Sequence, residues 1–265
     1  MSATTTEINL PFPEAERLEL RITVGACRLS IQASQPGGAW VSGSYHDPTG
    51  NLPCKVTQDG GKVRIAQEPK WREMPNVTHG TPEFQLALGD ARPYRLAIET
   101  GASESSCELG GLPLERLSIK QGAAKMNVDF SAPNRQPMDK LDIDAGASNL
   151  ELRGLANANA AAFKLDGGAA SYLLDFDGQL QRDLDARVTA GVASLEIRVP
   201  ASTAARISVD TTLGSTDAGD GFLRRDGAYL TEAAVQGVTP QLTLKASMSL
   251  GMLRLRATPR RLPQA

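Results

Sequence analysis

The sequence predicts an all-β protein, a parallel β-solenoid (β-helix-like) built from two-strand coils of about 22 residues, with a small antiparallel hairpin cap near the N-terminus. Two observations predict this class. A glycine recurs at a nearly constant spacing, and apolar residues alternate with polar ones on both sides of it. Helical periodicity is absent from almost the whole chain, and the 265 residues are expected to form a single domain over 1–265.

The repeat is anchored on glycines that are followed by alanine or valine. In the regular part of the chain, successive anchors lie 21 to 24 residues apart, and such a spacing is typical of a stacked repeat. The anchors are Gly25, Gly101, Gly122, Gly146, Gly168, Gly191 and, more weakly, Gly214.

The apolar pattern around each glycine predicts a bent strand. Around Gly122, for example, apolar residues occupy Leu117 and Ile119 before the glycine and Met126 and Val128 after it. Each stretch has the period of two of a strand with one buried face, but the parity changes across the glycine. A straight strand would turn the second set outward. We therefore expect a bend at each Gly-Ala, where glycine supplies a positive φ or a tight turn.

The elements follow in chain order. A first coil is expected over 15–32, and a non-repeating hairpin, cap and loop segment over 33–92. Within that segment Asp59-Gly60-Gly61 indicates a hairpin, and the stretch from Pro69 to Phe84 indicates a loop. Regular coils, each paired with the one before it, are expected over 93–214. They are followed by an insertion loop over 215–239, a final coil over 240–258 and a tail over 259–265.

Composition excludes several classes of function. The 28 Lys and Arg are balanced by 30 Asp and Glu, whereas a protein that neutralises nucleic-acid phosphates should be clearly basic. Two His and three Cys exclude most transition-metal sites with several such ligands, and no cofactor is expected. Neither a signal peptide nor a transmembrane segment is visible, so we expect a cytoplasmic protein that reaches a membrane only through a partner.

An acidic cluster is the best candidate for chemistry. Asp142 and Asp144 lie two apart on one strand and face outward, and Asp166 takes the place of Asp144 on the following coil. Such carboxylates hold Ca²⁺ or act as acid and base in some β-helix enzymes that act on polysaccharides. The favoured interpretation is a solvated polar face that Lys120 and Lys164 neutralise. We therefore predict no catalytic, cofactor-binding or metal-binding residue, with the three aspartates as candidates only under the polysaccharide interpretation.

Two smaller groups occur in the non-repeating segment. Trp40, Tyr45 and Trp71 are either a ligand platform or the small core of the cap, and we favour the core. His46 beside Asp47 imitates a base and the group that orients it, but the following Pro-Thr-Gly favours a polar loop.

The repeated pattern L-x-I-x-x-G-A-x-x-L-x-L, with ELGGLPLERLSIKQGAAKMNVDF and DKLDIDAGASNLELRGL, resembles the toast-rack domains over roughly residues 15–258. These include a family of bacterial adhesin-like proteins and the C-terminal domain of LiaF-like envelope-stress proteins. The resemblance implies a non-enzymatic β-solenoid that is associated with cell-envelope stress and surface interaction, often beside a membrane anchor. This sequence shows no such anchor, and the resemblance transfers no functional residue.

We therefore expect a non-enzymatic interaction or scaffold module that presents a rigid face to a protein partner, which itself can be membrane-associated. Two alternatives stay open: a polysaccharide-binding or polysaccharide-cleaving β-helix that uses the aspartates, and a self-assembling structural solenoid. A homo-oligomer is compatible with the sequence, and nucleic acid is not an expected partner.

Overall fold

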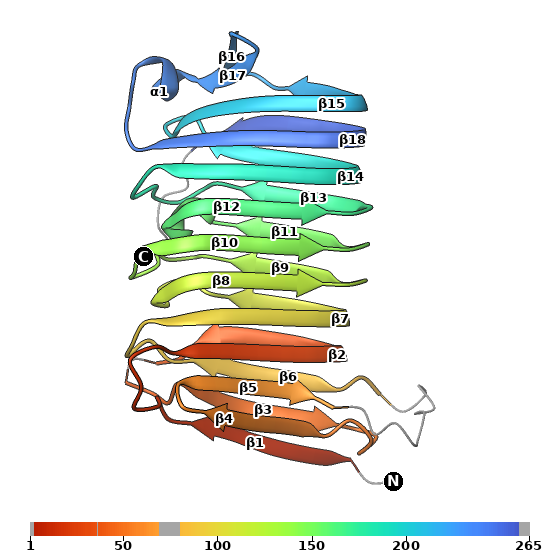
Figure 1. The fold of residues 1–265 in the computed structure, drawn as a ribbon. Coiled ribbons are helices and arrows are strands. Elements are labelled where there is room, and N and C mark those ends of the chain that lie inside the picture. Colours follow the sequence, from red (N-terminus) through yellow and green to blue (C-terminus); the bar gives the residue numbers. More distant parts are fainter. Residues whose placement is uncertain (1–2, 36, 69–79, 260–265) are drawn as a thin grey trace.

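The computed structural model describes residues 3–35, 37–68 and 80–259, and it confirms the all-β class. The strands are stacked into one elongated ladder (Figure 1). Each rung of this ladder consists of a strand segment before a bend and a segment after it. The first segments form one face of the molecule, the second segments form the opposite face, and the core lies between them.

Apart from antiparallel pairings at the two ends of the ladder, strands on both faces pair in parallel with their neighbours. Five long strands run through the bend and belong to both faces: β2 (Glu19–Ala33), β7 (Tyr94–Glu108), β14 (Leu184–Pro200), β15 (Ala204–Ala218) and β18 (Gln241–Thr258). The first face also contains β8 (Leu114–Gln121), β10 (Met138–Ala145) and β12 (Ala160–Gly167). The second face also contains β9 (Lys125–Asp129), β11 (Asn149–Arg153) and β13 (Ala170–Asp175). The predicted parallel pairing is present from β2 through β14.

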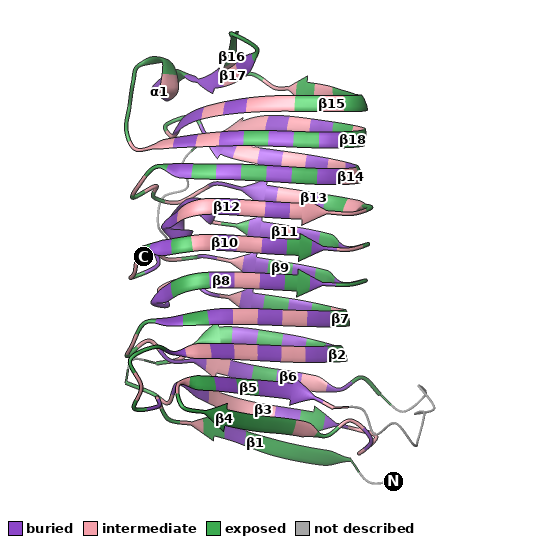
Figure 2. Ribbon diagram, viewed as in Figure 1, coloured by how far each residue is buried: buried purple, intermediate pink, exposed green. Residues whose placement is uncertain are grey.

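The change of parity across the bend is present as predicted. In β2, Leu20 and Ile22 are buried before Gly25, and Leu29 and Ile31 are buried after it, so both halves direct their apolar side chains into the same core. Figure 2 shows the resulting alternation of buried and exposed residues along the strands. No rung encloses its own apolar residues, so neighbouring rungs complete the core for one another.

Of the two reasons predicted for the bend glycines, the positive φ is wrong for six of the rungs. In these rungs the bend glycines are Gly25, Gly101, Gly122, Gly146, Gly168 and Gly191, and none of them has a φ in the left-handed region, whereas Gly251 at the bend of β18 has a φ of +132°. Their backbones instead approach one another closely from rung to rung. A Cβ on Gly146 would lie 2.9 Å from the carbonyl oxygen of Gly122, and a Cβ on Gly122 would lie 3.1 Å from that of Gly101. Glycine is favoured at these tight positions because the stacked backbones leave little room for a side chain.

The order of the rungs also departs from the prediction. The strand expected to stack on β14 was the one that contains Gly214, but β14 pairs with β18, and β15 pairs with the other edge of β18. The predicted final coil over 240–258 is therefore an internal rung, and β15 is the terminal one (Figure 1). The period of the repeat identifies equivalent positions in the rungs, but it does not determine which rungs are neighbours.

Buried asparagines hold the connections that lead from one rung to the next. The side chain of Asn134 accepts a hydrogen bond from the Leu114 N–H at 2.9 Å and donates to the Leu114 carbonyl at 2.8 Å. The Asn157 amide donates to the Phe130 carbonyl at 2.8 Å. These contacts satisfy backbone groups that the strands do not use. A short 3₁₀ helix, Leu155–Ala158, lies among them.

The N-terminal end carries more structure than predicted. Its strands are β1 (Thr4–Leu10), β3 (Val41–Asp47), β4 (Cys54–Asp59), β5 (Lys62–Gln67) and β6 (Glu83–Leu88). The β4–β5 hairpin turns at Gly60-Gly61 as expected, and β3 pairs antiparallel with β1 and β6. However, β5 and β6 pair in parallel with the two halves of β2, so part of the segment 33–92 forms a rung. Glu83-Phe84 lies in a strand, while residues 69–79 of the predicted loop lie outside the described residues.

At the opposite end, the predicted insertion loop contains β16 (Phe222–Arg225), β17 (Ala228–Thr231) and the single-turn helix α1 (Glu232–Val235). Strand β17 pairs antiparallel with residues 206–208 of β15. Among the described residues, no helix has the length and apolar character needed to cross a membrane.

Candidate functional site

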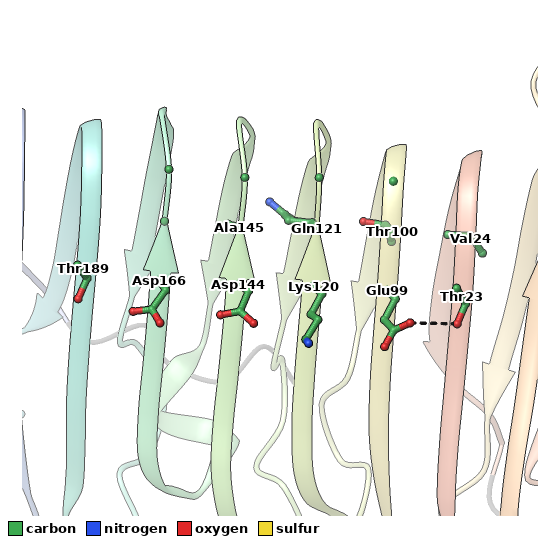
Figure 3. A pocket seen from close by; sticks show the side chains of 15 residues that line it. Thr23, Val24, Glu99, Thr100, Lys120, Gln121, Asp144, Ala145, Asp166 and Thr189 are labelled. Atoms are coloured by element: carbon green, nitrogen blue, oxygen red, sulfur yellow. Dashed lines mark hydrogen bonds between the residues drawn. The ribbon is translucent and has the colours of Figure 1, made fainter.

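A shallow groove of about 840 Å³ crosses the first face next to the bends. Its most prominent side chains come from the position two residues before each bend glycine, one from each rung. We call this set the bend row: Thr23, Glu99, Lys120, Asp144, Asp166 and Thr189. Figure 3 shows these side chains standing in line across neighbouring strands.

The strand register places the bend row. Glu99 pairs with Lys120, Lys120 with Asp144, and Asp144 with Asp166 in the parallel ladder. Because neighbouring strands are ~4.8 Å apart, the row presents charged groups at a fixed interval. Side chains alternate between the core and the surface along each strand. The position next to each bend glycine faces the core, so the position two residues before the glycine, which forms the bend row, faces outward.

The two outer carboxylates of the row are already paired. Glu99 accepts from Arg21 at 3.0 Å and from the Thr23 hydroxyl at 3.4 Å, both on the neighbouring strand β2. Asp166 forms an ion pair with Lys164 of its own strand. That hydrogen bond and the charge of Asp166 raise the pKa of the Lys164 ammonium group, with smaller contributions from Asp142 and Asp144.

The two central charges of the row differ from their neighbours. Lys120 and Asp144 are both exposed, and neither forms a hydrogen bond or an ion pair with another described residue. They lie opposite each other in the β8–β10 register. A cation and a carboxylate therefore stand side by side in the middle of the groove.

The predicted acidic cluster is assembled, with one correction to its neutralisation. Asp144 and Asp166 are in-register neighbours in the groove, and Asp142 lies on the same face two residues along β10. Asp142 is paired with Lys140 at 2.9 Å, and Asp166 with Lys164. Lys164 thus neutralises an aspartate as predicted, but the second neutralising lysine is Lys140 and not Lys120. Sequence reasoning considered Lys120 only as a neutralising charge and missed Glu99 and Arg21, although their offsets from the glycines contain the signal.

The described residues offer little for metal or nucleophilic chemistry. No group of three or more His, Cys, Asp or Glu among them is arranged to hold a metal ion. Burial raises the pKa of the Cys27 and Cys107 thiols to about 12 and that of Cys54 to about 11. These thiols stay protonated at neutral pH, so they are poor nucleophiles.

The pair His46–Asp47 does not form a base with an orienting carboxylate. The His46 Nδ1 lies 3.1 Å from the Thr5 hydroxyl, and Asp47 bonds to the loop that follows it. Asp47 accepts from the Thr49 N–H at 2.9 Å and from the Leu52 N–H at 2.7 Å. Burial acts to raise the pKa of Asp47, but these hydrogen bonds outweigh it and hold the pKa below its usual value.

The aromatic side chains of the N-terminal segment belong to the core. Trp40 and Tyr45 are fully buried; Trp40 packs on Phe12 and Tyr94, and Tyr45 packs on Phe84. The predicted small core is thus confirmed for these two residues, and Trp71 lies outside the described residues.

Comparison with known families and structures supports the fold. The family model described as the N-terminal domain of toast_rack, DUF2154, matches residues 1–140, which is more than half of the chain. No curated protein matches the chain. A candidate cell-adhesion protein from Clostridium sporogenes has a similar structure, with 13% identity and a TM-score of 0.54. That alignment covers 97% of this chain and 100% of the other, and at this identity it shows the fold alone.

Two further structures are more distant. A candidate adhesin from Bacteroides fragilis is 9% identical with a TM-score of 0.47, over 96% of this chain and 97% of the other. A candidate lipid-binding protein from Parabacteroides distasonis is 14% identical with a TM-score of 0.40, over the same shares of the two chains. Neither likeness carries an argument about this chain.

Proposed function

Since this chain belongs to the toast-rack family, we propose that it is a non-enzymatic binding module, a β-solenoid scaffold that holds the bend row against a protein partner. The observation that carries the proposal is the exposed pair of Lys120 and Asp144 in the groove, with no partner among the described residues.

The scaffold fixes the geometry of this pair. Both residues lie on strands that are hydrogen-bonded on two sides, β8 between β7 and β10, and β10 between β8 and β12. A partner with a carboxylate beside an ammonium or guanidinium group would match the two charges without rearrangement of the backbone. Exposed ion pairs contribute only ~0.2–1 kcal/mol each, so specificity comes from satisfying both charges at once in a partly dehydrated contact.

The same surroundings favour binding over catalysis. The groove is shallow, its outer carboxylates are held by Lys164 and Arg21, and its lining contains threonine hydroxyls but no thiol or imidazole. A general acid or a nucleophile needs a group whose protonation is tuned and a cavity that positions the substrate. We therefore propose that the groove recognises a surface and leaves it chemically unchanged.

The decisive experiment compares two double variants on the same face. Lys120→Ala/Asp144→Ala removes the unpaired charges of the groove. Lys140→Ala/Asp142→Ala removes an ion pair whose members neutralise each other at 2.9 Å. Immobilised proteins are exposed to an envelope extract of the source organism, and bound proteins are quantified by mass spectrometry. We expect a protein that binds the wild type and the control variant but is lost at least tenfold from the groove variant. A bound set that is the same for all three proteins would contradict the proposal.

A second candidate function rests on the adjacent carboxylates Asp144 and Asp166, which could bind a linear polysaccharide lying along the bend row. It requires that wild-type protein binds glycans on an array and that Asp144→Asn/Asp166→Asn loses this binding. Binding that survives the substitutions, or no binding by the wild type, removes this candidate.

A further inference from the structure

The outer edge of the terminal rung is covered over only part of its length. The β16–β17 hairpin pairs with residues 206–208 of β15, and the inner edge of β15 pairs with β18. Among the described residues, none pairs with the outer edge of β15 from residue 209 to residue 218. Figure 2 shows this part of the strand, at the end of the ladder, as intermediate or exposed and without a buried residue. Uncovered backbone N–H and C=O groups of this kind are a template for an added strand.

This uncovered stretch is bent in its middle. It runs from Val209 to Ala218, and the bend of the rung falls at Leu213 and Gly214, where Gly214 stacks on Gly251. A straight strand from another protein could follow the edge on only one side of the bend. A second copy of β15, running antiparallel, carries the same bend at the same place and can follow both sides.

An apolar stripe marks the same place. The position after the bend glycine is alanine in five rungs, but it is Val192 in β14, and the residues in register with Val192 are Leu250 in β18 and Leu213 in β15. These three side chains are 54%, 45% and 74% exposed, and Leu213 is the most exposed large apolar residue among those described. A contiguous exposed apolar patch of this kind is typical of an interaction surface.

We propose that two copies of this chain associate end to end about a two-fold axis at the Leu213 bend, with the uncovered stretches of β15 paired antiparallel. The two sheets of one copy then continue into the sheets of the other. The association uses the same surface on both copies, so it closes as a dimer and does not propagate into a filament. It does not depend on the proposed function of the groove.

Charge selects the register of this pairing. If the axis passed between Leu213 and Gly214, Asp210 of one copy would lie opposite Asp217 of the other, and like charges directly opposite are destabilising. If the axis passes through Leu213, the two Leu213 side chains meet, Asp210 lies opposite Thr216 and Asp217 lies opposite Val209. The second register therefore hides the most exposed apolar side chain and separates the carboxylates.

The size of the contact sets its strength. In this register nine residues of edge, 209–217, at ~3.4 Å each and a width of ~10 Å give an area of roughly 300 Å² for each copy. A stable specific interface buries about 800 Å² on each partner. Exposed apolar side chains at the same end, Leu223, Val235 and Val238, enlarge the contact but belong to the hairpin and the segment around α1. We therefore expect a reversible dimer with a Kd in the micromolar range or weaker, populated at high protein concentration.

Sedimentation velocity from about 1 µM to about 500 µM tests the proposal with a matched pair of variants. Leu213→Lys places a charge on the axis, and Val56→Lys places one on the exposed edge strand β4 at the opposite end. The wild type and Val56→Lys should shift from monomer to dimer with the same Kd, and Leu213→Lys should weaken the dimer at least tenfold. Because the Leu213 side chain is 74% exposed, the melting temperature of the variant should stay that of the wild type.

A covalent test locates the axis. Under mild oxidation, Leu213→Cys should form a disulfide-linked dimer, because the two side chains face each other, whereas Val56→Cys should form no more dimer than the wild type. Wild-type protein that stays monomeric over the whole range, or a dimer that is unaffected by Leu213→Lys, would overturn the proposal. Species that grow beyond a dimer and are sensitive to both lysine variants would overturn it in favour of head-to-tail assembly.

Discussion

The two ends of the ladder are finished in different ways. At the N-terminal end, β5 and β6 add a rung next to β2, and hydrogen bonds of buried side chains hold this rung in place. Gln67 accepts a hydrogen bond from the Gly25 N–H at 2.9 Å and donates to the Tyr45 hydroxyl at 3.2 Å. Asp47 closes the following loop with both of its carboxylate oxygens. This end is held by polar contacts within a close-packed aromatic core.

At the C-terminal end, the side chain of Thr231 holds the covering hairpin by hydrogen bonds. Thr231 accepts from the Ala205 N–H at 2.9 Å and donates to the Thr203 carbonyl at 2.7 Å, which fixes the hairpin at the start of β15. Beyond residue 208, the outer edge of β15 has no pairing strand among the described residues, and Leu213 stands in solvent. Buried polar contacts thus hold the N-terminal end, whereas the outer edge of the C-terminal rung is unpaired over residues 209–218 among the described residues.

The largest contrast is expected from two glycine substitutions, one at each end. Gly43 in β3 has a φ of +141°, and a Cβ there would lie 1.9 Å from the Gln85 carbonyl oxygen, so Gly43→Ala should lower the free energy of unfolding by roughly 3–5 kcal/mol. Gly227, in the β16–β17 turn, has a φ of +75° but open space around it. Gly227→Ala should lower the free energy of unfolding by only about 1 kcal/mol. Urea unfolding of both variants measures the difference, and equal losses would contradict the contrast between the ends.

A smaller effect is expected from Asp47→Asn, which replaces a charged acceptor by a neutral one in the N-terminal loop. We expect a loss of about 1–3 kcal/mol at pH 7. Because the folded state lowers the pKa of Asp47, its stabilising effect is complete above the unfolded value of about 3.9 and disappears as the pH falls through the folded value. Unfolding measured from pH 7 to pH 3 should therefore show the gap between wild type and variant closing in acid. A gap that is independent of pH would mean that the carboxylate charge is not what holds the loop.

The smallest effect distinguishes the middle of the ladder from its C-terminal part. A Cβ on Gly146 would lie 2.9 Å from the Gly122 carbonyl oxygen, whereas a Cβ on Gly191 would lie 3.4 Å from that of Gly168. Gly146→Ala should lower the free energy of unfolding by about 1–2 kcal/mol. Gly191→Ala should leave it unchanged or raise it by up to about 1 kcal/mol, since alanine restricts the unfolded chain. Thermal unfolding provides the comparison, and the same sign for both variants would refute the close approach as the reason for the glycines.

Sequence periodicity predicted the rungs well, because burial follows the alternation of apolar residues directly. It identified the bend at Gly122, the inward side chains on both sides of it and the in-register aspartates Asp144 and Asp166. It could not predict the position of β18, since strands with the same pattern are interchangeable until the connections are known. It also missed β1, where only Ile8 is buried in a run of polar residues.

The candidate site was harder to predict than the fold. The offsets place Lys120 and Asp144 on one row, but whether their charges are satisfied depends on rotamers and on neighbours such as Arg21 and Lys140, which the spacing does not determine. The positive φ, one of the two reasons expected for the bend glycines, is absent from most of them for a similar reason. A close approach between stacked backbones depends on three-dimensional packing. It selects glycine just as a turn does, so the sequence does not distinguish the two.

Amide hydrogen exchange, resolved by residue in dilute monomeric protein, tests the order of the rungs most directly. In a parallel ladder, an internal strand uses all of its N–H groups, whereas an edge strand uses every second one. If β18 lies between β14 and β15, the amides of β14 and β18 should exchange slowly throughout, away from the bend. The amides from Val209 to Ala218 should alternate between slow and fast exchange. Alternation along β18 with uniform protection of β15 would place β18 at the end of the ladder and contradict this account.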